Sequence, residues 1–244
     1  MTDVSGLPLA LVTGAAHRIG RAIALALARQ GFAIGLHYHR SRDAAEETAG
    51  LLAETGAPVY LLPADLTAPV AIDDLFVRVA GLPHSLGVLV NSAAAMPRGD
   101  LRDLPVEEWD AVFDLNLRAP WLCARAAARL MEPAGGVIVN ISDSGAGKAW
   151  TGYPAYVISK NGLEALTRLL ASSLAPRVRV NAVAPGLILP SPDLPPETWQ
   201  RLVERLPLQA AGQPEDVARA VLFFIQNPYI TGQVLAVDGG YQMV

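Results

Sequence analysis

Short apolar runs alternate with longer segments of mixed character along the whole chain. The runs that are apolar at nearly every position cover residues 7–13, 32–38, 58–63, 86–91, 136–141, 178–183 and 234–237. Runs of this length without polar alternation are typical of strands buried on both faces of a parallel sheet. The pattern therefore predicts a parallel sheet of about seven strands.

The segments between these runs carry apolar residues at helical spacing. The predicted helices cover 18–30, 43–55, 71–80, 105–131, 156–175, 197–205 and 215–226. We expect the long segment 105–131 to be interrupted or kinked near Pro120, because proline cannot donate a helical hydrogen bond. Strands that alternate with helices through right-handed crossovers predict the α/β class. The fold expected is a Rossmann-like, doubly wound parallel sheet flanked by helices, in a single domain over residues 1–244.

One long irregular stretch begins at residue 187 and holds four prolines before residue 197. Loops of that length in a compact domain are often lids or substrate-binding segments. We expect a substrate loop over about residues 187–206.

Composition and charge narrow the classes of function. The chain has 244 residues, of which 52% are hydrophobic, and its formal net charge is −4. That charge argues against a nucleic-acid partner, which would require a basic face. The single cysteine, Cys123, excludes a disulfide framework, and no metal-ligand spacing is present, so no metal is expected. The absence of a signal peptide and of an apolar run of about 20 residues predicts a cytoplasmic protein without a membrane partner.

The first strand runs into a glycine-containing turn and then a helix, in the sequence Thr-Gly-Ala-Ala-His-Arg-Ile-Gly over residues 13–20. Backbone N–H groups and the helix dipole at such a junction favour a pyrophosphate. Gly14 would permit the tight turn and Gly20 the close packing of helix on strand. We expect a dinucleotide site that includes Gly14, Arg18, Ile19 and Gly20; an ordinary tight turn is the alternative.

The end of the second strand indicates which dinucleotide binds. NAD-preferring folds place an acid there, whereas this chain has His39, Arg40 and Ser41. A guanidinium and a hydroxyl favour a phosphate, so the cofactor expected is NADP(H). A solvated basic turn is the alternative. Asp65, followed by Leu66 after the third strand, could accept from the adenine amino group or could cap the next helix.

Tyr156 and Lys160 lie four residues apart on a predicted helix and therefore share a face. A neighbouring ammonium stabilises a phenolate and lowers the pKa of the tyrosine, which suits general acid–base chemistry. The same ammonium could hold a ribose hydroxyl.

Together these motifs resemble the short-chain dehydrogenase/reductase family over essentially the whole chain. In that family the Tyr156 and Lys160 positions are the catalytic pair, and Asn116 matches the asparagine that holds a water in the proton relay. The resemblance also implies that residues lining the cofactor are Asn91, Ala93, Pro185 and Gly186. The ending Val-Asp-Gly-Gly over 237–240 is similar to that of members that form tetramers, which implies a homotetramer.

Asp143 stands where the family normally has its catalytic serine, thirteen residues before the tyrosine. With Arg18 in the phosphate loop, this makes the chain most similar to the pteridine reductases and dihydromonapterin reductases. A carboxylate can accept two parallel N–H bonds from the amino-pyrimidine edge of a pterin. Two alternatives stay open: Ser144 as the working serine after a register slip, and Asp143 as a strand-end cap.

The resemblance implies that substrate contacts come from Arg18, Met96, Asp143, Tyr153 and Tyr156. Met96 stands where pteridine reductases have an aromatic ring, and methionine packs on a flat ring less specifically. The function expected is NADPH-dependent reduction of a C=N bond in a dihydropterin or dihydrofolate-like substrate. The rivals are a carbonyl reductase of the same family, acting on 3-oxoacyl thioesters, sugars or other ketones, and a non-catalytic NADP(H) sensor.

Overall fold

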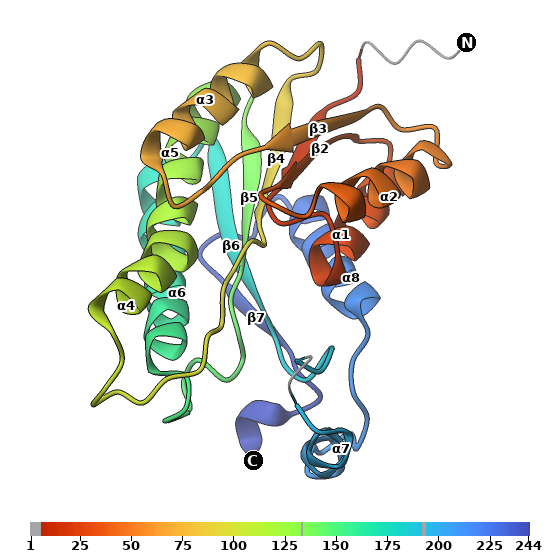
Figure 1. The fold of residues 1–244 in the computed structure, drawn as a ribbon. Helices are drawn as coiled ribbons and strands as arrows, with labels where there is room; N and C mark the ends of the chain where they lie inside the picture. Colours follow the sequence, from red (N-terminus) through yellow and green to blue (C-terminus); the bar gives the residue numbers. More distant parts are fainter. Residues whose placement is uncertain (1–5, 133, 192–193) are drawn as a thin grey trace.

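The computed structural model describes residues 6–132, 134–191 and 194–244, and its centre is one parallel sheet (Figure 1). The strands lie in the order β3-β2-β1-β4-β5-β6-β7, and every pair is parallel. Their bounds are β1 Leu9–Val12, β2 Ala33–Tyr38, β3 Val59–Pro63, β4 Leu86–Asn91, β5 Gly136–Ile141, β6 Val178–Pro185 and β7 Val234–Val237. The expected doubly wound α/β sheet is confirmed.

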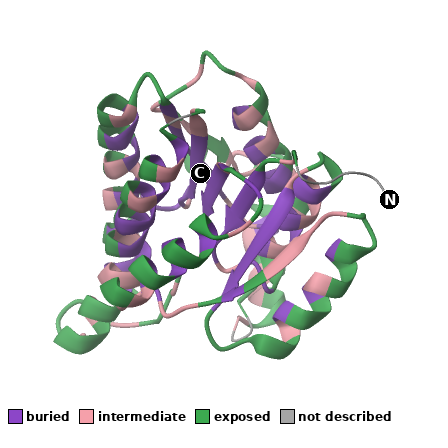
Figure 2. Cartoon of the chain, turned by 90° about the horizontal axis from the view of Figure 1, so that it is seen from above, coloured by how far each residue is buried: buried purple, intermediate pink, exposed green. Residues whose placement is uncertain are grey.

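Helices cover both faces of this sheet (Figure 1). One face carries α1 (Arg18–Arg29), α2 (Arg42–Ala53) and α8 (Pro214–Gln226), and the other carries α3 (Pro69–Ala80), α4 (Val106–Phe113), α5 (Ala119–Met131) and α6 (Pro154–Leu174). The central strands and the inner helix faces are buried, the edge strands β3 and β7 are mostly half-buried or exposed, and the outer helix faces are exposed (Figure 2).

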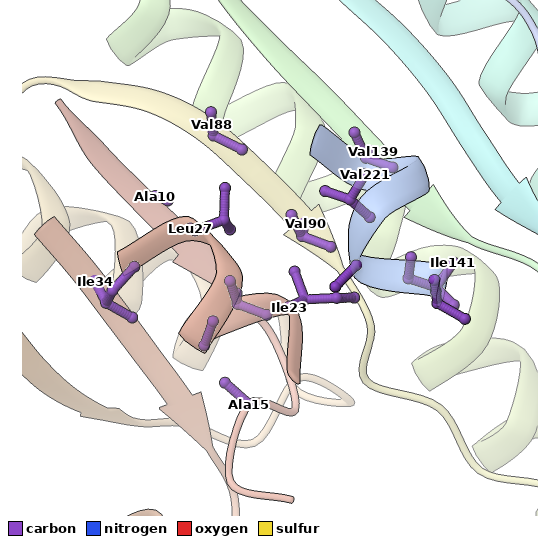
Figure 3. Close-up of a cluster of buried hydrophobic side chains, with 14 of the residues drawn as sticks. Ala10, Ala15, Ile23, Leu27, Ile34, Val88, Val90, Val139, Ile141 and Val221 are labelled. Atoms are coloured by element: carbon purple, nitrogen blue, oxygen red, sulfur yellow. The ribbon is translucent and has the colours of Figure 1, made fainter. Parts of the chain in front are cut away.

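Each face of the sheet has its own apolar core. On the first face, Ile23 and Leu27 of α1 meet Val221 of α8 above the strand side chains of Val90 and Val139 (Figure 3). On the second face, leucines and alanines of α3, α5 and α6 pack on the same strands. Burying each Val, Leu or Ile side chain contributes about 1.5–3 kcal/mol, so the strand runs without polar alternation stabilise both layers.

Several helices begin at a proline that the sequence pattern had assigned to the preceding turn. α3, α6, α7 (Pro196–Glu204) and α8 each start at the proline one or two residues before the predicted helix. Proline suits the first turn of a helix, because its fixed φ is helical and an N–H there has no helical acceptor.

The predicted break near Pro120 takes the form of a π-helical turn. The turn η1 covers Asp114–Arg118, directly before α5, and the N–H of Ala119 donates to the carbonyl of Asp114, five residues earlier. Pro120 has no N–H to offer the carbonyl of Asn116, so the regular i+4 ladder fails at that point. Single π turns of this kind occur frequently at functional sites, and Asn116 lies within this one.

The carboxyl ends of the parallel strands meet at one edge of the sheet. The strand order reverses between β1 and β4, and ligands of doubly wound folds bind outside such a switch point. The second half of the predicted substrate loop is α7, whereas residues 192 and 193 of that loop lie outside the described residues. No helix in the described part of the chain combines the length and the apolarity needed to cross a membrane.

Candidate active site

A cavity of about 590 Å³ opens at the switch point. Most residues that the sequence assigned to the cofactor or substrate line it: Gly14, Arg18, Ile19, Gly20, His39, Arg40, Ser41, Asp65, Leu66, Ala93, Met96, Asp143, Tyr156, Lys160 and Pro185. These residues come from segments spread over more than 170 positions of sequence. The separate sequence motifs each predicted a part of the site, and the fold places these parts around one cavity.

The turn after β1 is built so closely that it requires glycine. Gly14 has a φ of +65°, and a Cβ on it would lie 2.9 Å from the Cα of Ala93. A Cβ on Gly20 would lie 2.3 Å from the carbonyl oxygen of Gly14. Thr13 closes the neighbouring turn, because its hydroxyl accepts from the N–H groups of Ser92 and Ala93 at 2.9 and 3.1 Å. The start of α1 is thereby held open toward the cavity, as an anion site requires.

His37 of β2 supports this turn, and sequence reasoning did not assign it a place in the site. Its Nδ1 accepts from the N–H of Gly14 at 3.1 Å, and its Nε2 lies 3.1 Å from the carbonyl oxygen of Ala64. The ring is therefore neutral, with the proton on Nε2. Burial, and to a smaller extent the nearby His39 and Arg78, lowers the pKa of His37 to about 4. The signal in the sequence was a polar residue inside an otherwise apolar strand.

His37 makes the stability of the protein sensitive to acid. The unfolded chain takes up a proton near pH 6.5, whereas the folded chain does so near pH 4. Stability is therefore full above about pH 6.5 and is lost as pH falls toward 4, by about 3 kcal/mol for this pKa difference. His37→Asn keeps an acceptor for Gly14 and removes the titration. We expect the melting temperature of wild type to fall more steeply than that of His37→Asn between pH 6.5 and 4; parallel curves would contradict the assignment.

Arg18 joins the phosphate loop to the predicted substrate loop. Its Nη2 donates to the carbonyl oxygens of Leu189 and Pro190, each at 3.2 Å. Arg18 has a φ of +54°, a left-handed conformation that costs a non-glycine residue roughly 1–2 kcal/mol. The guanidinium therefore lies over the cavity between the two loops, where it can reach either an anion or a substrate.

The basic turn after β2 lies at the opposite end of the cavity. His39, Arg40 and Ser41 are exposed there, and the Nε2 of His39 is 3.8 Å from Oδ2 of Asp65. Oδ1 of Asp65 accepts from the backbone and the hydroxyl of Thr67 at 3.0 and 2.7 Å, and these bonds chiefly lower the pKa of Asp65. Asp65 thus fixes the turn before α3 while its second oxygen faces the basic residues; the cap position of α3 itself belongs to Ala68.

The chemistry-bearing residues meet at the carboxyl end of β5 and on α6. The hydroxyl of Tyr156 donates to Oδ2 of Asp143 at 2.7 Å. The ammonium of Lys160 donates to the carbonyl oxygen of Ile141 at 2.7 Å and lies 5.7 Å from the centroid of the Tyr156 ring. The spacing of four residues does place Tyr156 and Lys160 on one helix face.

The protonation of this cluster differs from the expectation that Lys160 lowers the pKa of the tyrosine. Burial, followed by the charge of Asp143 and its hydrogen bond, raises the pKa of Tyr156 well above its usual value. Burial also raises the pKa of Asp143 and lowers that of Lys160 to about 8. Tyr156 therefore holds its proton firmly in this arrangement, because its nearest polar partner is an acid and the ammonium points to a backbone carbonyl.

The geometry also addresses the alternatives at Asp143. Oδ1 of Asp143 accepts from the N–H of Gly145 at 2.7 Å, so the residue caps the strand end and faces Tyr156 at the same time. The hydroxyl of Ser142 turns to Glu164 at 3.0 Å. Within the described chain, the buried hydroxyl of Ser144 has no hydrogen-bond partner, and Ser144 does not line the cavity. Asp143, and not Ser144, is the partner of the phenol.

Four of the expected site residues lie outside this cavity. Asn91 donates to Asn140 at 2.8 Å inside the sheet, and a Cβ on Gly186 would lie 2.6 Å from that of Asp238. Asn116 uses its side-chain amide on the backbone of Ala95 and on Ser159. These three residues position their neighbours. The fourth, Tyr153, lines a second cavity.

Two aromatic residues near Asp143 were given at most a minor place by the sequence. Trp150 packs directly on Gly145, and its ring centroid lies 6.1 Å from that of Tyr241 in the short helix η2 (Tyr241–Met243). Burial raises the pKa of Tyr241, and the charge of Asp143 adds to this effect. Residue 241 follows the Gly-Gly ending, and no local pattern in the sequence predicted its contact with Trp150. Among the described residues, no group of three side chains could hold a metal ion.

Comparisons with known proteins agree with this geometry. A family model described as enoyl-(acyl carrier protein) reductase matches residues 14–242. A 3-oxoacyl-(acyl-carrier-protein) reductase of Synechocystis sp. is 35% identical over 96% of this chain and 97% of its own length. A crystal structure of FolM alternative dihydrofolate reductase 1 from Brucella canis complexed with NADP superposes with a TM-score of 0.92 at 36% identity, over 97% of this chain and 94% of that one.

The acetoin dehydrogenase YohF from Salmonella typhimurium superposes with a TM-score of 0.87 at 32% identity, over 98% of this chain and 97% of that one. The matches therefore cover nearly the whole chain, and by name they include a dihydrofolate reductase, a 3-oxoacyl reductase and an acetoin dehydrogenase. Given the sheet order, the glycine turn, the Tyr156–Lys160 pair and these full-length matches, the chain belongs to the short-chain dehydrogenase/reductase family.

Proposed function

We propose that this protein is an NADPH-dependent reductase of a C=N bond in a dihydropterin or dihydrofolate-like ring. One observation carries the proposal: a carboxylate, Asp143, lies at 2.7 Å from the hydroxyl of Tyr156 in the cavity, at the position where ketone reducers of the family have a serine. A serine hydroxyl can donate to a carbonyl oxygen, whereas an ionised carboxylate can only accept. This site is therefore suited to a substrate that presents N–H groups.

The residues of the cavity fit a phosphorylated dinucleotide. A side chain at position 14 or 20 would fill the space that the two glycines leave. This space lies at the N-terminus of α1 and is part of the cavity. Arg40 and Ser41 would bind a 2′-phosphate, and Oδ2 of Asp65, which lies 3.8 Å from Nε2 of His39, would accept from the adenine amino group. Lys160 would hold the ribose. When bound, NADPH supplies the hydride for the reaction.

The protein's own residues would manage the proton and the orientation of the ring. Tyr156 stays protonated because its pKa is raised, so it would supply the proton that the substrate nitrogen takes up. Each oxygen of Asp143 already accepts one bond and has a second lone pair, so the carboxylate could also accept two parallel N–H groups of the substrate. Lys160, cationic below about pH 8, would stabilise the phenolate that remains. The backbone carbonyl of Asn116, which cannot accept from Pro120 because proline has no N–H, is the atom that we assign to a relay water.

A second candidate is carbonyl reduction, because the relative in Synechocystis is named for a 3-oxoacyl substrate and because the ring platform is Met96, which is 42% exposed. A non-catalytic NADP(H) sensor is disfavoured, since a binding protein has no need of a buried Tyr156–Asp143 pair beside an ammonium.

The direct test is NADPH oxidation by the wild type with 7,8-dihydrobiopterin, 7,8-dihydrofolate, a 3-oxoacyl thioester and a simple ketone, side by side. The proposal expects turnover with at least one dihydropterin and a lower kcat/KM with the thioester and the ketone. Turnover of a carbonyl substrate alone would replace it by the second candidate, and no NADPH oxidation with the whole panel would favour the sensor.

The basic turn predicts cofactor preference. Arg40→Asp is expected to weaken NADPH binding about tenfold to a hundredfold, the worth of a charged phosphate contact, and to move preference toward NADH. Arg42→Gln is the matched control, because Arg42 pairs with Glu46 at 2.8 Å and does not line the cavity. Fluorescence titration gives the dissociation constants of both cofactors. Equal affinity of the wild type for NADPH and NADH would contradict the assignment of the basic turn to the 2′-phosphate.

We also propose a homotetramer, supported by two separate apolar surfaces. Trp121 of α5 and Leu169 of α6 are 44% and 67% exposed, and Phe223 of α8 and Leu235 of β7 are 44% and 37% exposed. Two unlike self-complementary surfaces build a tetramer with three twofold axes. Sedimentation analysis should give a tetramer for the wild type and a dimer for Leu169→Glu; a monomeric wild type would contradict the proposal.

A further inference from the structure

A second cavity, of about 1000 Å³, lies beside the active site, and Tyr153 is the one lining residue to which the sequence assigned a role, a substrate contact. Two loops form it, residues 98–102 after β4 and residues 149–153 before α6, together with the first turns of α6. The N–H of Gly99 donates to the carbonyl oxygen of Gly152 at 3.0 Å, so the loops are fixed to each other. We call this space the Arg98 pocket; its ring-bearing and charged lining residues are Arg98, Asp100, Arg102, Trp150 and Tyr153.

The Arg98 pocket is connected to the catalytic cluster through its aromatic wall. The indole of Trp150 lies so close to Gly145 that a Cβ there would be 2.2 Å from a ring carbon, and Gly145 in turn donates to Asp143. Tyr153, whose ring centroid is 6.4 Å from that of Trp150, stands one helical turn before Tyr156. A molecule held by Asp143 and Tyr156 could therefore extend along these two rings without leaving the protein surface.

The charge of the pocket comes from one arginine. Arg102 is neutralised by Asp100, with Nε–Oδ1 and Nη2–Oδ2 distances of 3.0 and 2.7 Å. Arg98 donates through Nε to the hydroxyl of Tyr153 at 2.8 Å, and its guanidinium carbon lies over the Tyr153 ring, 5.6 Å from the ring centroid. In the described chain its terminal nitrogens have no acceptor, and Asp103 of the same loop does not line the pocket. An unneutralised guanidinium held over one ring of an aromatic wall is a recognition element for a carboxylate attached to an aromatic group.

We propose that the Arg98 pocket binds the aromatic, carboxylate-ended tail of a conjugated pterin, so that the preferred substrate is a folate and not an unconjugated pterin. This inference rests on the proposed function of the neighbouring site. Trp150 and Tyr153 pack against the aryl group of the tail, and Arg98 pairs with the carboxylate at its end.

The test compares 7,8-dihydrofolate with 7,8-dihydrobiopterin, which lacks the tail, in wild type, Arg98→Gln and Arg129→Gln. Arg129 is an exposed residue of α5 that lines neither cavity. Wild type is expected to prefer dihydrofolate. Arg98→Gln keeps a donor for Tyr153 and loses the charge, so KM for dihydrofolate should rise about fivefold to tenfold with kcat and the dihydrobiopterin kinetics unchanged. Arg129→Gln, which removes a charge outside the pocket, should resemble wild type.

A binding measurement separates the pocket from the reaction. p-Aminobenzoyl-L-glutamate, the tail alone, should bind to the NADP⁺ complex in calorimetry, more weakly to Arg98→Gln and normally to Arg129→Gln. Equal kcat/KM for the two pterins in wild type, with no effect of Arg98→Gln, would overturn the inference and leave the proposed function standing. If the wild type turned over neither pterin but did turn over a 3-oxoacyl thioester, and if that turnover depended on Arg98, both this inference and the proposed function would be overturned.

Discussion

Tyr156→Phe is expected to lower kcat about 10²–10⁴-fold, the usual contribution of general acid catalysis. The substitution keeps the ring that packs on α6 and removes only the hydroxyl that donates to Asp143 at 2.7 Å. Because the raised pKa of Tyr156 keeps the proton on the wild-type phenol, the lost group is the proton donor itself. NADPH affinity should stay near that of wild type, as should the melting temperature. Stopped-flow measurement of a single turnover reports the chemical step.

Lys160→Ala is the informative comparison, because Lys160 is assigned two roles: it stabilises the phenolate of Tyr156 and it holds the ribose of the cofactor. It should lower kcat and weaken NADPH binding together, whereas Tyr156→Phe separates the two effects. A Tyr156→Phe enzyme that kept most of its single-turnover rate would show that the proton comes from another group.

The layers of the fold could be predicted from the sequence because each strand is a local signal. The bounds of strands β4, β5 and β7 were predicted to the residue, since a polar residue or a glycine flanks each of these runs on both sides. Where a proline occupies the first turn of a helix, the start of that helix was predicted one or two residues too far along the chain. Proline is favoured both in turns and at first helical positions, so it does not mark the boundary between them. The π turn at Asn116 was located only as a break near Pro120, since the register of a helix across such a break depends on tertiary contacts.

A site residue could be predicted where both its type and its place at the end of a strand or in the following segment indicate a role in the site. Gly14, Arg40, Asp143 and Tyr156 follow from the order of strands and turns, and all four line the cavity. His37 and Trp150 could not be predicted in the same way, because their contacts join segments far apart in the sequence. The pKa of Tyr156 was predicted in the wrong direction, since a spacing of four residues fixes the helix face but not where the ammonium points.

Asp143→Ser is expected to change the two classes of activity in opposite directions. A substrate that presents N–H groups loses its acceptor, and leaving such groups unpaired in the site costs about 1–3 kcal/mol. That cost lowers kcat/KM for a dihydropterin by about tenfold to a hundredfold. The new hydroxyl can donate to a carbonyl oxygen, so kcat/KM for a ketone should hold or rise.

Stability is the control for this variant, because Asp143 also accepts from Gly145 at the end of β5. Serine can replace that short bond, so the melting temperature should change little. Should the melting temperature and both activities fall together, Asp143 would be a structural cap and the pterin assignment would lose its main support.

The most direct measurement of the central claim is therefore one ratio: kcat/KM for the best dihydropterin divided by kcat/KM for the best ketone, in wild type and in Asp143→Ser, with NADPH saturating. If Asp143 selects a substrate with an N–H edge, the ratio falls by about tenfold or more in the variant. An unchanged ratio would contradict the claim that this carboxylate distinguishes pterin reduction from carbonyl reduction.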